Sequence, residues 1–293
     1  MKKQHRTGQI ILNLIFIILC LCFIVPFLYS ISISFSDEGT LIREGYSLLP
    51  KKISSEAYRM VFRNPTQIIQ SYKITILFSL VSTVFAMLVM SMLAYAISRE
   101  NCKFRKPLVV IVLITMLFNA GMVPNYLLIT KYLNLSNNIL VYILPGAVSA
   151  WNLIILRTNF KAVPFSLIEA AKLDGASETY ICFRIVMPLS LSTISAIAFL
   201  FLVPKWNDWY TSLLYIDDPK MYSLQFVLQR ILRETEFLKQ MAQTGQEKVD
   251  ISQIPTESFK YAMALVVAGP MLIVFPFFQK YFVKGMTVGS VKE

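Results

Sequence analysis

Six long apolar runs constrain the fold of this 293-residue chain more than any other feature. A helix rises 1.5 Å per residue, so roughly 20 apolar residues are needed to cross the hydrocarbon core of a bilayer. The runs cover residues 9–35, 73–98, 108–130, 139–157, 186–204 and 260–280. None contains Asp, Glu, Lys or Arg away from its ends, and none alternates as barrel strands do. Lipid offers no hydrogen-bond partners, so every backbone polar group must be paired within the protein. We therefore predict an all-α integral membrane protein with six transmembrane helices.

The composition agrees with a membrane protein. Hydrophobic residues make up 56% of the chain and charged residues only 15%, whereas a soluble domain has about 25% charged residues. The net charge of +11 would suggest nucleic-acid binding in a soluble protein. Here the basic residues concentrate in short segments between runs, most clearly in 99–107, which is the signature of cytoplasmic loops. We therefore expect a lipid bilayer, and no nucleic acid, around this chain.

The same rule sets the expected topology. Both termini are placed in the cytoplasm, where the inner segments are 1–8, 99–107, 158–185 and 286–293. The longer outer loops are 36–72 and 205–258. The first of them begins a short interfacial helix near Ser55, and the second contains an amphipathic helix near Leu224–Met241.

Several function classes are disfavoured. Ionisable groups inside spans mark ion-coupled carriers, and these spans have essentially none. The single histidine, His5, cannot supply a zinc-protease motif, and no Gly-Lys pair exists for a Walker A loop. The four cysteines lack zinc-ligand spacing, so we expect no metal and no bound cofactor. Energy for any transport would have to come from a partner.

A few polar side chains do lie within or next to the runs. They include Asn119, Asn125 and Asn152, together with Ser192 and Ser195. Such residues either line a polar pathway or join one helix to another by hydrogen bonds, and both interpretations stay open.

The segment from Pro164 to Glu178 is the most informative cytoplasmic stretch. Ser166 and Glu169 have capping-box spacing, which predicts a helix that begins just after Ser166. Gly175 can adopt positive φ and end that helix, and a second short helix can follow up to the span near Val186. We therefore expect a helix–Gly–helix unit that docks into a cleft; the alternative is an ordinary loop helix on the membrane surface.

This segment resembles the EAA loop of permease subunits of binding-protein-dependent ABC importers. The Glu-Ala-Ala-x-x-Asp-Gly-Ala pattern is matched from Glu169 to Ala176, and Ile185-Val186-Met187-Pro188 follows as in that loop. Met187 replaces the usual Leu, and Ser192 stands where many members have a second proline.

Three further stretches are similar to carbohydrate-uptake permeases of the maltose type. Trp206-Asn207-Asp208-Trp209 matches their Trp-Asn-x-Trp pattern, and 278–285 looks like their C-terminal signature. The stretch from Asn119 to Pro124 is similar to a branch that imports complex oligosaccharides. The resemblance implies one transmembrane domain over 9–285, with the coupling loop at 158–185 between spans 4 and 5.

The resemblance also implies a non-enzymatic subunit of the bacterial cytoplasmic membrane, forming half of a pathway for an oligosaccharide. The implied partners are a cytoplasmic ABC ATPase dimer that binds and hydrolyses ATP, a second homologous permease and an extracytoplasmic solute-binding protein. The implied ATPase-coupling residues are Glu169, Ala170, Ala171, Asp174 and Gly175. Candidate sugar contacts, chosen because amides bind hydroxyls and aromatic rings stack on sugar faces, are Asn119, Asn125, Trp151, Asn152, Trp206 and Asn207. For the tryptophans an interfacial position is an equal alternative.

Three other functions stay open at this point. The chain could serve an importer of a non-sugar solute such as a peptide or polyol. It could be a membrane scaffold or assembly protein, or a stand-alone channel. Solute-dependent stimulation of a partner ATPase separates the importer from the scaffold.

Overall fold

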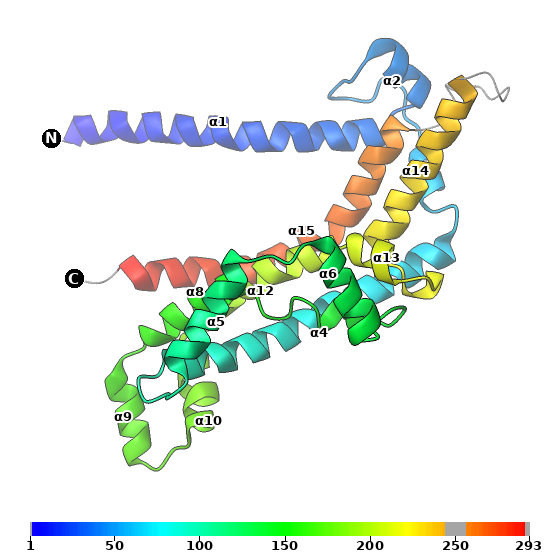
Figure 1. The fold of residues 1–293 in the computed structure, drawn as a ribbon. Coiled ribbons are helices and arrows are strands. Elements are labelled where there is room, and N and C mark those ends of the chain that lie inside the picture. The colour runs from blue at the N-terminus through cyan, green and yellow to red at the C-terminus, as the bar shows by residue number, and fades with distance from the viewer. Residues whose placement is uncertain (1, 244–255, 291–293) are drawn as a thin grey trace. The chain divides into compact units, whose positions relative to one another are not determined.

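The computed structural model describes residues 2–243 and 256–290, and its regular elements are helices throughout this part of the chain (Figure 1). Two compact units are present. One comprises residues 1–68 and 227–270, and the other comprises 69–226 and 271–293. We call them unit 1 and unit 2 and describe each by itself.

Unit 1 contains α1 (Lys2–Ser34), α2 (Glu38–Glu44) and α3 (Glu56–Val61), most of α14 (Leu224–Gln243) and the first part of α15 (Glu257–Ser290). The short helix α3 confirms the helix predicted near Ser55, and α14 confirms the amphipathic helix predicted near Leu224–Met241. An antiparallel bridge between Ser36 and Ile53 closes the loop that holds α2.

Glu38 at the start of α2 is buried, with 5% of its surface exposed. Its carboxylate accepts hydrogen bonds from the backbone N–H groups of Glu257 and Ser258, at 2.9 and 3.0 Å, and from the Ser258 hydroxyl at 2.9 Å. The first N–H groups of a helix have no partner within it, and an anion there also interacts favourably with the helix dipole. A side chain from α2 therefore caps the last long apolar helix of the chain.

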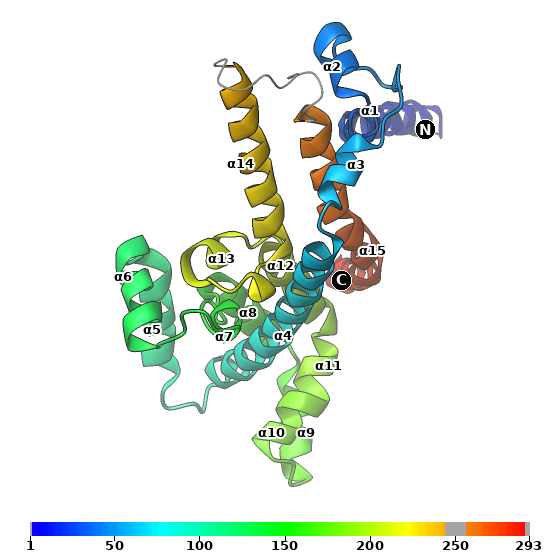
Figure 2. The ribbon, with the colours of Figure 1, turned by 90° about the vertical axis from the view of Figure 1, so that its right-hand side faces the viewer.

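Unit 2 holds the remaining elements. They are α4 (Pro65–Ser98, from Ile69 on), α5 (Arg105–Leu117), α6 (Met122–Leu127), η1 (Leu128–Tyr132), α7 (Leu140–Ile143), α8 (Ala150–Lys161), α9 (Phe165–Leu173), α10 (Glu178–Ile181), η2 (Cys182–Val186), α11 (Met187–Leu189), α12 (Leu191–Trp206), α13 (Tyr210–Tyr215) and η3 (Pro219–Met221). Figure 2 shows α5, α7 and α8 from a second side.

One face of α4 is lined by small residues. Ser71, Thr75, Ser79, Ser82 and Ala86 recur every three or four positions and are nearly or fully buried. The Ser82 and Thr83 hydroxyls donate to the Ser79 carbonyl of their own helix, so burial leaves these polar groups satisfied. Small, internally bonded side chains let neighbouring helices approach closely in a membrane.

Three of the six predicted spans are confirmed as helices long and apolar enough to cross a membrane: Gly8–Ser34, Pro65–Ser98 and Glu257–Lys280. The other three runs are not continuous helices. The run 108–130 bends by 118° between α5 and α6, and the helices on either side of Ser190 meet at 82°. The run 139–157 is divided into α7 and α8. Counting each bent pair as one span gives up to five candidates in the described residues.

Glycine and proline explain two of the breaks. Gly121 and Gly146 have φ of +84° and +73°, a conformation that a helix cannot include. Pro145 also lacks the N–H that a continuing helix would use.

The cap on α15 yields a stability prediction. Glu38→Ala leaves the N–H groups of Glu257 and Ser258 unpaired in a buried site, and we expect a loss of about 2 kcal/mol. Glu44→Ala is the matched control, because Glu44 forms an exposed ion pair with Lys51 and such pairs contribute little. The measurement is the thermal unfolding midpoint of the purified protein in mild detergent. Equal midpoints for both variants would contradict the capping role.

Candidate functional site

The helix–Gly–helix prediction for the segment 164–186 is confirmed. Helix α9 ends at Leu173, Gly175 has φ of +80°, and α10 begins at Glu178 behind a Ser177 side chain that accepts from the Tyr180 N–H. The Ala176 N–H bonds to the Ala171 carbonyl at 2.9 Å and the Gly175 N–H to the Lys172 carbonyl at 3.0 Å. These two bonds form a Schellman motif, which requires a left-handed residue where Gly175 lies.

The predicted capping box at Ser166 is wrong. Helix α9 begins two residues earlier than predicted, at Phe165, and its N-cap is Pro164 with no side-chain hydrogen bond. Pro164 has an extended ψ of 126°, and its carbonyl accepts from the Leu167 N–H. Ser166 therefore lies inside the first turn, where its hydroxyl is not placed to cap.

Apolar side chains anchor this segment to the rest of unit 2. Ile168 on α9, Ile181 on α10 and Val186 at the end of η2 are nearly or fully buried. They belong to one core cluster with the C-terminal part of α4 and with α8, including Ile97 and Leu156. The loop is therefore a fixed part of the helical core rather than a free appendage.

The opposite side of α9 is uncovered. The predicted coupling residues Glu169, Ala170, Asp174 and Gly175 are exposed, and Ala171 is half-buried. Two large apolar side chains accompany them, since Leu173 is 89% and Phe165 60% exposed. Both views show α9 and α10 together at one end of the unit (Figures 1 and 2). Exposed apolar and acidic groups on an anchored helix form a surface suited to a protein partner.

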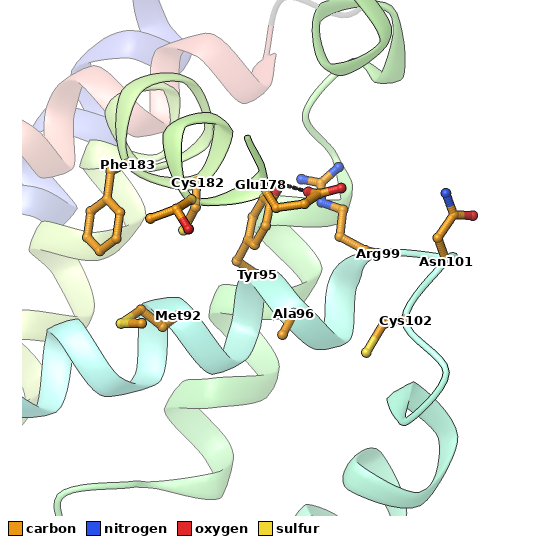
Figure 3. A pocket seen from close by; sticks show the side chains of 10 residues that line it. Met92, Tyr95, Ala96, Arg99, Asn101, Cys102, Glu178, Cys182 and Phe183 are labelled. Carbon is orange, nitrogen blue, oxygen red and sulfur yellow. Dashed lines mark hydrogen bonds between the residues drawn. The ribbon is translucent and has the colours of Figure 1, made fainter. Parts of the chain in front are cut away.

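A polar network ties α10 to the end of α4. Glu178 forms an ion pair with Lys172 at 2.6 Å and accepts a hydrogen bond from the Tyr95 hydroxyl (Figure 3). Burial raises the pKa of the Glu178 carboxyl, but the bonds from Lys172 and Tyr95 outweigh it and hold the pKa below its usual value. The carboxylate therefore stays ionised at neutral pH. Because Tyr95 lies inside an apolar run, this network is not visible in the sequence.

A second feature of unit 2 is a cavity of about 430 Å³. Two of the predicted solute contacts, Asn119 and Asn125, line it together with Lys205, Tyr210 and Tyr215. Residues at two of the helix breaks also line the cavity: Gly121 between α5 and α6, and Pro145 and Gly146 between α7 and α8. Amides, hydroxyls, an ammonium group and aromatic rings therefore converge on one space, as in sites for polar small molecules.

Lys205 lines this cavity although it is not among the predicted solute contacts. It follows directly on an apolar run, in the last turn of α12, and its ammonium group donates to the carbonyls of Tyr142 and Pro145 at 2.6 and 3.4 Å. These carbonyls lie where α7 ends and the chain turns toward α8. Lys205 thus satisfies backbone groups that the broken helix leaves unpaired.

The other four predicted contacts lie elsewhere. Trp206 is buried, 3% exposed, and its ring is 6.4 Å from that of Tyr72. Asn207 is exposed and bonds to Gln225 at 2.7 Å. Trp151 is 62% exposed at the start of α8, and Asn152 beside it is buried. Among the described residues, no group of three His, Cys, Asp or Glu side chains could hold a metal ion.

Three helices long and apolar enough to span a membrane, two apolar runs broken beside a polar cavity, and an anchored loop with an exposed face define a membrane transport subunit of the permease class. The model of the family described as "Binding-protein-dependent transport system inner membrane component" matches residues 74–288. The chain belongs to this family.

Named relatives support the assignment over the full length. The chain is 35% identical to the polygalacturonan/rhamnogalacturonan transport system permease protein YtcP of Bacillus subtilis (strain 168), over 99% of both chains. It is 36% identical to Protein LplC of the same organism, over 92% of this chain and 89% of LplC. A crystal structure of a bacterial ABC transporter involved in the import of the acidic polysaccharide alginate contains a chain with 26% identity and a TM-score of 0.77. That match covers 94% of this chain and 97% of the other.

The position of Lys205 yields a second prediction. Lys205→Met leaves the Tyr142 and Pro145 carbonyls without their donor, and we expect the stability to fall by about 1–3 kcal/mol. Lys205→Arg should recover most of the loss, because a guanidinium group also donates to carbonyls. Lys220→Met, which removes an exposed lysine outside the cavity, is the control. Detergent thermal stability is the readout, and an unchanged midpoint for Lys205→Met would show that the bonds contribute nothing.

Proposed function

We propose that this chain is the permease subunit of an ABC importer and forms half of the pathway for an oligosaccharide. ATP hydrolysis takes place in separate cytoplasmic ATPase subunits, and a second permease and an extracytoplasmic binding protein complete the machine. The observation that carries the proposal is the exposed face of α9 on a loop fixed into the helical core. Relatives named as permeases for arabinooligosaccharides and galactooligosaccharides favour a sugar over another solute.

The exposed face of α9 is proposed as the docking surface for the ATPase. Glu169 would pair with a basic residue in a groove of that subunit, Ala170 and Ala171 would let the two backbones approach closely, and the exposed Leu173 would enter an apolar pocket. Asp174 and Gly175 would hold the turn that presents them. Because Ile168 and Ile181 pack into the core, movement of the docked helix would be transmitted to the ends of the spans.

The cavity beside Asn119 and Asn125 is proposed as part of the sugar pathway. Irregular backbone at membrane depth is tolerated where it lines a cavity, and broken helices mark the binding sites of many transporters. The breaks at Gly121 and Gly146 both line this cavity. Trp151, Asn152, Trp206 and Asn207 stay predictions for other parts of the pathway or for the interfaces with partners.

Six spans are also proposed, with both termini in the cytoplasm. The two bent pairs would each count as one span, and α7 with α8 would form the sixth. Leu153, Leu156 and Phe160 of α8 are fully buried within the core of unit 2, as expected for a span among other spans. The basic loop at 99–107 and the loop at 158–185 would then share the cytoplasmic side.

The test of this function is purification followed by an ATPase assay. The C-terminally tagged chain is extracted from its native membrane in mild detergent, and co-purifying proteins are identified by mass spectrometry. We expect an ATPase with a Walker motif and a second permease. ATP hydrolysis by the reconstituted complex should rise when a sugar-loaded binding protein is added. Recovery of the chain alone, or hydrolysis that no solute stimulates, would favour a channel or a scaffold.

Variants of the coupling loop give a third prediction. Gly175→Pro is incompatible with a φ of +80° and removes an N–H that bonds to Lys172, so it should distort the turn. Glu169→Lys reverses an exposed charge without touching the core. We expect both to reduce uptake at least about tenfold while the protein still reaches the membrane.

Glu100→Lys is the matched control for Glu169→Lys. It reverses a charge that is also exposed, on the neighbouring loop, where its contact with Arg105 is 3.9 Å long. Uptake and ATPase activity in membrane vesicles are measured together. Normal uptake in both loop variants would exclude α9 as the coupling helix.

A further inference from the structure

A second cavity, of about 340 Å³, lies where α4 ends and meets α10 and η2 (Figure 3). Its apolar wall is formed by Met92 and Ala96 on α4 and by Phe183 on η2. Its polar rim carries Arg99 and Glu178. The cavity has no part in the proposed docking face or sugar pathway, so its content is a separate question.

Arg99 is incompletely paired within the described residues. Its guanidinium group lies 4.5 Å from the centre of the Tyr95 ring, which covers one face. The Nε and Nη2 atoms are buried and have no hydrogen-bond partner. Glu178 on the same rim attracts Arg99 electrostatically but is bonded to Lys172 and Tyr95, and Arg99 forms no ion pair within 4 Å in the described part of the chain. Buried donors of a cation without an acceptor are costly, so an acceptor from outside the chain is expected here.

The cavity as a whole favours an amphiphilic anion. From Met92 to Arg99 the chain advances by about 10 Å along the helix axis, from the apolar interior of the span to its end. Met92 and Phe183 are 53% and 37% exposed, so part of the apolar wall is open to an acyl chain. A phosphate on Arg99 would then sit at headgroup level with its chains along α4. Lys106 near the start of α5, the helix that follows α4 in the chain, adds to the attraction for anions.

We propose that this cavity binds an anionic phospholipid, with the headgroup phosphate on Arg99 and an acyl chain against Met92, Ala96 and Phe183. Free phosphate shares the anionic chemistry but makes no use of the apolar wall. The site uses unit 2 alone and does not depend on the solute that is transported. Its failure and the failure of the importer function are therefore distinguishable.

The test is lipid binding to the purified full-length chain with the subunits that accompany it. Delipidated protein is titrated with phosphatidylglycerol or phosphatidylcholine and analysed by native mass spectrometry. We expect a preference for phosphatidylglycerol that Arg99→Gln reduces about tenfold, the loss of one charge-assisted contact. Lys103→Gln, which removes an exposed charge from the same loop outside the cavity, should keep the preference.

Ala96→Phe is the second variant, and it fills the apolar part while Arg99 stays in place. It should abolish the phosphatidylglycerol preference even if Arg99→Gln fails to fold. Displacement of the lipid by inorganic phosphate, with no effect of Ala96→Phe, would assign the site to a free anion and overturn the lipid proposal. Equal lipid binding by wild type and Arg99→Gln would overturn it as well, and would leave Arg99 to pair with a partner protein.

Discussion

The need to satisfy every backbone polar group without water is the constraint on which this structure depends. Continuous helices such as α4 meet it within themselves, whereas helix ends and broken helices meet it with side chains. Lys205 donates to the carbonyls that end α7, the Asn119 side chain accepts from the Gly121 N–H at 2.8 Å, and Glu38 caps α15. Polar side chains that satisfy two of the breaks also line the larger cavity. The same irregular backbone that costs hydrogen bonds thus creates the polar space that a solute pathway needs.

The proposed coupling loop obeys a second constraint, because a surface that is to transmit force must not move independently of the helices that it moves. Ile168, Ile181 and Val186 supply the apolar anchor, and the Schellman motif at Gly175 fixes the angle between the two short helices. The bonds from Tyr95 and Lys172 to Glu178 add a polar connection to the end of α4. Charged contacts of this kind contribute little to stability when they are exposed. Their value here is geometric, since they fix α10 against a particular span.

How much of the fold can be predicted from the sequence depends on whether each apolar run forms one unbroken helix. The runs 9–35, 73–98 and 260–280 are recovered as long helices because their hydrophobicity is not interrupted by a residue that needs positive φ. The run 108–130 contains Gly121 and the run 139–157 contains Pro145-Gly146, and hydropathy alone does not register the breaks. The helix–Gly–helix loop was predictable because Gly175 has a direct conformational signature. The capping box failed because capping-box spacing does not guarantee an N-cap, and here Pro164 takes that position. Asn119 and Asn125 line one cavity because the chain bends between α5 and α6, whereas Trp206 is buried in the core. The spacing of these residues along the sequence predicts neither position.

The cavity and the proposed coupling loop belong to one compact unit, and this bears on how they would be coupled. Helix α12 carries Lys205 beside the cavity at its C-terminal end, and Ile194 and Ile197 nearer its start lie in the core cluster that also holds Ile168. Helix α8 joins the same cluster, and Arg157 near its end donates to the Ile97 carbonyl at the end of α4 at 3.2 Å. A close-packed interior transmits displacement and has few voids to absorb it. Under the proposed function, no dedicated path of residues is needed between the cavity and the coupling loop. A tilt of the packed helices as one body moves the residues at both sites together.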